Sequence, residues 1–155
     1  MAEIRIRCAA SDDAAARARV HVDAWRQAYH GLVPDERLAR LSYGRGRENF
    51  ARWVVDGTQE TYVAEKAGEA VGFLTLGRCR DADVDAETVG EIWGMYLAPA
   101  CWRQGIGTRL CRHGERIFRG RDLRAVVLWV FAANDRARRF YEAMDYCVGG
   151  SLTDA

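Results

Sequence analysis

The chain has 155 residues, the size of one ordinary domain and enough to bury a hydrophobic core without disulfides or metal. Its 23 basic and 22 acidic residues leave a formal net charge of +1, so no overall field recruits nucleic acid or an anionic membrane. With five scattered cysteines, no signal peptide and no apolar run near the roughly 20 residues that span a bilayer, we expect one domain (1–155) in the reducing cytoplasm.

The N-terminal half predicts a strand followed by helices. Residues 3–8 alternate polar and apolar side chains, which is typical of a short strand. Ser11 can accept from the free N–H groups of a helix, and an apolar stripe then predicts about five helical turns, ending at Gly31. Pro34 suits the first turn of a second helix, and a third helical segment is expected after Gly46.

The C-terminal half predicts a sheet whose strands alternate with helices. Residues 61–65 and 70–76 are rich in strand-forming residues and predict a hairpin. After an acidic loop, the pattern is strand, helix, strand, helix, strand, which predicts parallel pairing through right-handed crossovers. The expected ranges are 91–97, 106–119, 125–130, 135–144 and a last strand from Tyr146 onward. The predicted fold class is α/β: a mixed, twisted sheet with helices on both faces.

Two glycines stand where the predicted strand 91–97 gives way to a helix. Gly105 and Gly107 lie at the helix entrance, where unpaired N–H groups converge and the helix dipole favours negative charge. Glycine lets a phosphate touch this backbone, and residues 102–124 carry seven arginines against two acidic residues. The same pair also fits a tight turn that binds nothing, so the glycines alone leave both interpretations open.

Two other phosphate-binding loops do not match this segment. A dinucleotide-binding fingerprint needs a third glycine where Leu110 stands, and an acidic residue on the next strand, which has none. A Walker A loop needs a lysine after its last glycine, and the segment contains no lysine.

The segment Trp102-Arg103-Gln104-Gly105-Ile106-Gly107 matches Gln/Arg-x-x-Gly-x-Gly/Ala, except that Trp102 replaces the first Gln or Arg. This pattern resembles the acetyl-CoA motif of the GNAT superfamily of N-acetyltransferases. Residues 128–142 are similar to the next strand of that family, its asparagine and its tyrosine-bearing helix, and residues 24–35 are similar to its first helix. The resemblance therefore covers most of the chain. It implies a GNAT-like sheet without a full last strand, because the sequence ends at Ala155.

The resemblance implies an N-acetyltransferase that moves an acetyl group from acetyl-CoA to a primary amine, which attacks the thioester directly. The strand before the glycine turn, the turn itself and the last helix would hold the cofactor. The residues implied for this role are Met95, Tyr96, Leu97, Arg103, Gln104, Gly105, Ile106, Gly107, Thr108, Asn134 and Arg136.

Transfer to an ammonium needs a base for the amine and an acid for the departing sulfur. Tyr141 is the candidate acid by analogy with the family, and its ordinary interpretation is a core tyrosine. Glu91 is the candidate base, because its strand is expected to line the acceptor side. A solvated carboxylate at Glu91 with a water chain as the base is the alternative, and His30 is a weaker candidate.

Three aromatic residues are the candidates for acceptor binding. Trp25, Tyr29 and Trp93 could form an apolar or cation-binding wall, although Trp25 and Tyr29 also fit the buried stripe of the first helix. The acidic loop at 81–87 either draws a cationic amine or is simply solvated. We expect a small-molecule or peptide amine as the partner, and the sequence does not identify it.

Two rival functions remain at this point. A non-catalytic acyl-CoA-binding or sensing module would keep the glycine turn and lose the acid and base, whereas a structural module would carry the turn incidentally. No metal is expected, because Cys111 and His113 lack further ligands at suitable spacing. An uncovered sheet edge invites pairing with a second copy, so we expect a homodimer.

Overall fold

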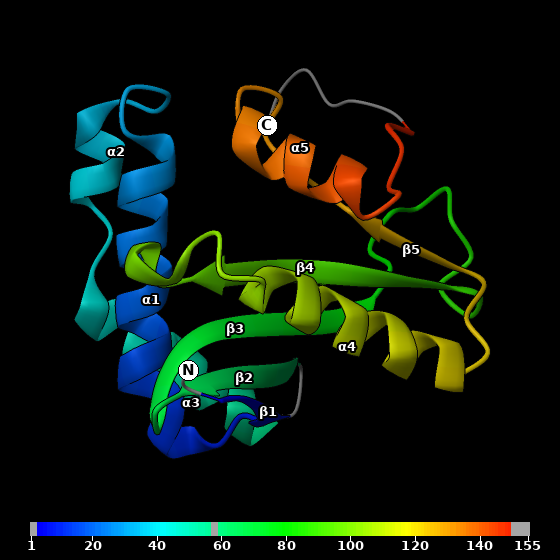
Figure 1. Ribbon diagram of the computed structural model, residues 1–155, viewed down its shortest axis with the longest axis horizontal. Helices are drawn as coiled ribbons and strands as arrows, with labels where there is room; N and C mark the ends of the chain where they lie inside the picture. Colours follow the sequence, from blue (N-terminus) through cyan, green and yellow to red (C-terminus); the bar gives the residue numbers. More distant parts are fainter. Residues whose placement is uncertain (1–2, 57–58, 150–155) are drawn as a thin grey trace.

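The computed structural model describes residues 3–56 and 59–149, in which five strands form one sheet in the order β1-β2-β3-β4-β5 (Figure 1). The strands are β1 (Ile4–Cys8), β2 (Glu60–Lys66), β3 (Glu69–Arg78), β4 (Val89–Leu97) and β5 (Ala125–Leu128). The first four strands pair antiparallel, and β5 pairs parallel to β4. The predicted mixed sheet is confirmed.

Helices cover both faces of this sheet, as predicted (Figure 1). They are α1 (Ala14–Tyr29), α2 (Asp35–Ala39), α3 (Tyr43–Asp56), α4 (Ile106–Gly120) and α5 (Asp135–Ala143), with short 3₁₀ turns at Ser11–Asp13 and Pro99–Cys101. On one face Val20 of α1 packs with Val63 and Phe73. On the other, Leu110 of α4 packs with Leu74 in the larger core. None of the described helices is long and apolar enough to cross a membrane.

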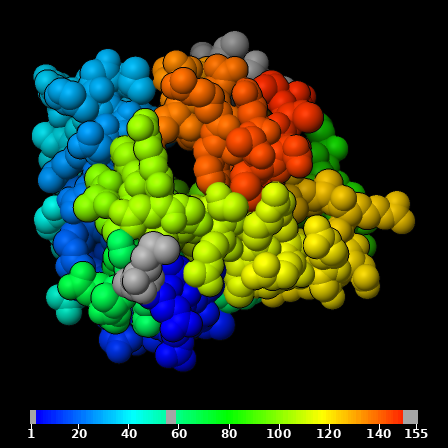
Figure 2. Space-filling model, viewed as in Figure 1, coloured from blue at the N-terminus to red at the C-terminus, as the bar shows by residue number. Residues whose placement is uncertain are grey.

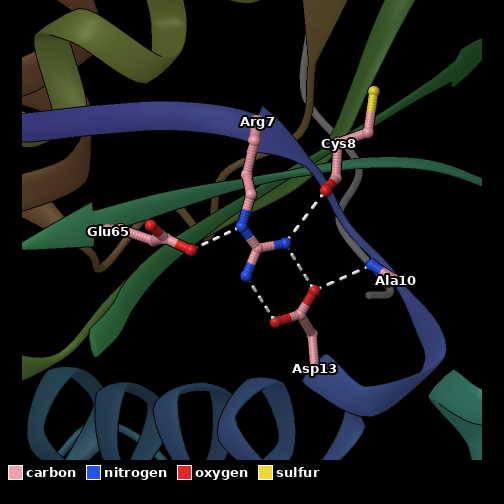
Figure 3. Close-up of polar contacts among 5 residues, drawn as sticks. All are labelled: Arg7, Cys8, Ala10, Asp13 and Glu65. Carbon is pink, nitrogen blue, oxygen red and sulfur yellow. Dashed lines mark hydrogen bonds and ion pairs between the residues drawn. The ribbon is translucent and has the colours of Figure 1, made fainter. Parts of the chain in front are cut away.

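The start of α1 differs from the prediction. Ser11 begins a 3₁₀ turn, and no side chain caps α1 in the described part of the chain. Figure 3 shows what stabilises this region instead: the Arg7 guanidinium donates to both oxygens of Asp13, at 2.8 Å each, and to Glu65 on β2. The Asp13 carboxylate also accepts from the Ala10 N–H at 2.7 Å. The ion pairs with Arg7 therefore tie β1, β2 and the entrance of α1 together.

The third helix begins earlier than predicted. Its first residue is Tyr43, so the helix contains Gly44 and Gly46, which were expected to precede it. A Cβ atom at Gly46 would lie 3.1 Å from the Cβ of Ala18 on α1. Gly46 is therefore inside the helix because it lets α3 approach α1 closely.

The predicted last strand is wrong for residues 146–149, which follow α5 without pairing to the sheet. The rest of that prediction falls on residues 150–155, outside the described residues. The Tyr146 hydroxyl donates to Glu115 on α4 at 3.0 Å, so this segment packs on a helix rather than along a strand. The homodimer expected from an open sheet edge stays a prediction.

The feature that positions the site is the separation of β4 from β5. The two strands pair only as far as Ile92 opposite Leu128. The register with β3 also shifts at this point: Leu76 lies opposite Ile92 and Thr75 opposite Gly94, which leaves one extra residue on β4. Beyond Ile92, the edge of β4 that faces away from β3 has no strand partner among the described residues.

Candidate functional site

A cleft of about 890 Å³ lies where β4 and β5 separate. Its walls come from α1, the second half of β4, the turn before α4, the chain after β5, and α5. Figure 2 shows a hollow between α1, the segment that follows β4, and α5. The separation of the two strands thus opens a space that these helices, β4 and the two connecting segments surround.

Most of the residues proposed from the sequence line this cleft. They are Trp25, Tyr29, Trp93, Met95, Tyr96, Leu97, Arg103, Gly105, Gly107, Thr108, Asn134, Arg136 and Tyr141. Three others do not line it. Ile106 is buried in the core, and Gln104 accepts from Lys66 at 2.7 Å. The third, Glu91, is buried and forms an ion pair with Arg80.

The structure explains why both positions of the turn before α4 are glycine. Gly105 has φ +82°, in the left-handed region, and a Cβ there would meet nothing within 4 Å. Gly107 is buried in the first turn of α4, where a Cβ would lie 3.2 Å from Leu97 and 3.4 Å from the ring of Phe140. These glycines bring the start of α4 against β4 and α5, and no described side chain caps that helix. Its first N–H groups are therefore available to an anion in the cleft.

The charges of the cleft are all positive. Among the described residues that line it, Arg103, Arg136 and Arg139 are the charged ones, and none is acidic. Burial, followed by the neighbouring charge of Arg103, lowers the pKa of Arg136. This unneutralised charge suits a phosphate ester, which guanidinium groups bind through charge-assisted hydrogen bonds.

Trp102 holds one of these arginines, a role that sequence reasoning missed. The Arg136 guanidinium lies 3.3 Å from the centroid of the indole ring, in a cation–π contact between α5 and the turn. The indole Nε1 in turn donates to the Leu97 carbonyl at 2.9 Å, which fixes the ring at the end of β4. Where the motif has Gln or Arg, this chain has an aromatic platform that positions a guanidinium from another helix.

An aromatic wall stands at the end of the cleft formed by α1. The ring centroids of Trp25 and Tyr29 are 4.5 Å apart, and Phe131 lies 5.2 Å from Tyr29 and 5.9 Å from Trp25. The Tyr29 hydroxyl accepts from Asn134, whose side-chain oxygen caps α5 by accepting from Ala137, both at 3.1 Å. Phe131 was missed because it follows a strand as one apolar residue among several. Its role depends on where the chain turns.

Glu91 does not face the cleft. The residue is 1% exposed and its carboxylate accepts from the Arg80 N–H at 2.9 Å and from the Arg80 guanidinium. The same guanidinium lies 4.5 Å from the ring of Trp93, whose indole covers Gly77 and donates to the Arg78 carbonyl. Buried and bound by Arg80, the Glu91 carboxylate does not line the cleft.

Tyr141 lies on α5 with its ring partly buried beside the cleft. Burial raises the pKa of Tyr141 above its usual value, and the neighbouring Cys111 adds to the effect. Within the described residues its hydroxyl makes no hydrogen bond. The phenol is therefore protonated at neutral pH and free to donate that proton to a group in the cleft.

His21 lies next to the aromatic wall, with its ring centroid 6.0 Å from that of Trp25, and it makes stability depend on pH. Its ring packs 4.6 Å from Tyr96, and burial, followed by the charge of Arg17, lowers the pKa of His21 to about 4. The unfolded histidine titrates near 6.5, so between these values the unfolded chain binds a proton that the folded chain does not. Stability must then fall as the pH falls through this window.

We expect this histidine to cost about 2 kcal/mol of unfolding free energy between about pH 7.5 and about pH 5. Urea denaturation of the wild type and His21→Gln at both pH values measures the effect, because glutamine cannot titrate. The wild type should lose about 2 kcal/mol more than the variant over this interval. Equal losses in the two proteins would contradict the assignment.

Known proteins resemble this chain in sequence. Residues 21–146 match the model of the acetyltransferase (GNAT) family. An uncharacterized N-acetyltransferase of Archaeoglobus fulgidus is 31% identical over 145 residues, covering 92% of this chain and 92% of that protein. A second uncharacterized N-acetyltransferase, YuaI of Bacillus subtilis, is 29% identical over 141 residues, which cover 90% of this chain and 78% of that protein.

A solved structure has the same fold. The PaiA N-acetyltransferase from Thermoplasma acidophilum, in complex with coenzyme A, superimposes with a TM-score of 0.85 at 20% identity, covering 97% of this chain and 94% of that one.

Proposed function

Because the chain belongs to the acetyltransferase (GNAT) family, we propose that it binds acetyl-CoA in the cleft and transfers the acetyl group to a primary amine by direct attack on the thioester. The observation that carries the proposal is the wall of the cleft near α4. There Arg103, Arg136 and the N-terminus of α4, which no described side chain caps, line the cleft, and no described lining residue carries a carboxylate. Such a wall suits the diphosphate of the cofactor.

Different walls of the cleft would bind different parts of acetyl-CoA. The first turn of α4, with Arg103 and Arg136, would hold the diphosphate. The unpaired edge of β4 would pair with the amide groups of the pantetheine arm, as an added strand pairs with a sheet edge. The Leu97 carbonyl already accepts from Trp102, so this pairing would use the residues before Leu97, and one N–H there would polarise the thioester oxygen.

Tyr141 would serve as the acid. The amine nitrogen forms a bond to the acetyl carbon, the carbon–sulfur bond breaks, and the sulfur leaves with the electron pair of that bond. The phenol then gives its proton to the thiolate. A chain of water molecules, rather than Glu91, would take the proton that the amine loses. The Glu91 carboxylate is already bound by the Arg80 guanidinium.

Calorimetric titration with acetyl-CoA, followed by thiol release in the presence of amines, tests the proposal. We expect binding that Arg136→Gln weakens about fivefold, since one charge-assisted contact is lost. Arg116→Gln removes the same charge from the exposed side of α4 and should leave the Kd unchanged. No binding would indicate a structural module. Binding without thiol release from any amine would favour the sensing module.

A further inference from the structure

The acceptor end of the cleft differs from the cofactor end in what its walls can bind. Resting on the proposed function, we infer that the acceptor is a primary monoamine carried on an apolar, preferentially aromatic, group. Amines with further ammonium groups, such as polyamines and aminoglycosides, are disfavoured. The inference rests on two properties of the described residues: their charge and the packing of their rings.

The first property is the absence of acidic side chains among the described lining residues. The attacking amine loses its proton, but a second ammonium on the same acceptor would stay charged. In this cleft it would lose hydration without gaining a carboxylate partner.

Two carboxylates near the cleft are engaged elsewhere. Glu91 is buried and held by Arg80. Asp81, in the acidic loop, accepts from the Trp129 indole at 3.2 Å and does not line the cleft. The acidic loop can therefore meet an approaching cation at the rim, but it provides no partner for an ammonium that has entered.

The second property is the contact among the aromatic rings. Trp25, Tyr29 and Phe131 all touch one another, with centroids 4.5 to 5.9 Å apart. A cage for an ammonium needs a gap between its rings that the cation fills, because the cation must lie over a ring face. These rings leave no such gap between them and present a continuous aromatic wall.

Part of this aromatic surface is open to solvent. Phe131 is 40% exposed and its neighbour Trp129 is 47% exposed, which is high for side chains of this size. An apolar group on the acceptor would cover these rings and gain from the burial of both surfaces. The same group brings no charge that the cleft would have to neutralise.

Three amines separate these effects: phenethylamine, hexylamine and hexamethylenediamine. Hexylamine and the diamine differ only in a distal ammonium, and phenethylamine tests the ring. With acetyl-CoA we expect kcat/KM to be about tenfold lower for the diamine than for hexylamine, and highest for phenethylamine. A higher value for the diamine, or no acetylation of any of the three while acetyl-CoA still binds, would overturn the inference. Loss of acetyl-CoA binding itself would instead overturn the proposed function.

A carboxylate placed in the aromatic wall should change the preference. Phe131→Glu adds the missing partner at a partly exposed position, and Phe131→Gln has nearly the same shape without the charge. We expect the diamine-to-hexylamine ratio of kcat/KM to rise about threefold in Phe131→Glu relative to Phe131→Gln. An identical ratio in the two variants would show that charge at this wall does not select the acceptor.

Discussion

Tyr141→Phe is expected to lower kcat about 100-fold, because the thiolate then leaves without a general acid. The ring and its packing are kept, so the Kd for acetyl-CoA should change by less than about twofold. Since burial raises the pKa of Tyr141, the wild type should also keep its acid protonated at pH values above the ordinary tyrosine range. Steady-state kinetics and calorimetry of the two proteins measure both quantities.

Tyr146→Phe is the matched control for this experiment. The two tyrosine rings lie 5.7 Å apart, but Tyr146 donates to Glu115 and does not line the cleft. Its variant should therefore keep its turnover and lose about 1 kcal/mol of stability, from the missing hydrogen bond. Unchanged kcat in Tyr141→Phe would remove the acid role, and equal losses of kcat in both variants would indicate a packing effect.

Arg80→Ala is expected to lower the free energy of unfolding by about 3 kcal/mol, because it leaves a buried carboxylate without its charged partner. Glu91 is 1% exposed while the Arg80 side chain covers it, and after the substitution the Arg80 N–H remains as its donor. The double variant Arg80→Ala with Glu91→Gln should recover part of that loss, since the amide carries no charge. Chemical denaturation of the wild type, both single variants and the double variant measures this coupling.

The same variants decide the role of Glu91 in turnover. With a water chain as the base, Glu91→Gln should keep kcat within about threefold of the wild type once the folded fraction is taken into account. A fall of two or more orders of magnitude in kcat without loss of stability would show that Glu91 is the base despite its ion pair with Arg80.

Most of the elements could be predicted from local patterns, because these patterns report the period of a helix or strand directly. The hairpin of β2 and β3, strand β4 and helices α4 and α5 all lie within a few residues of their expected ranges. The predictions that failed concern contacts between elements. Gly46 reads as a helix breaker until Ala18 is seen beside it. Residues 146–149 read as a strand until Tyr146 is seen bound to α4.

In the candidate site, too, local features could be predicted and contacts between elements could not. The glycine turn could be found from the sequence pattern, because a helix entrance is encoded within a few positions, whereas the roles of Asn134 and Tyr141 were implied by the resemblance to the GNAT superfamily. Only the tertiary structure decides the contacts between these side chains. Arg136 stacks on the ring of Trp102, and the ring of Phe131 packs against that of Trp25. Arg80 forms an ion pair with Glu91. These contacts join residues 11 to 106 positions apart, and they depend on the extra residue in β4 and on loops whose paths no local period encodes.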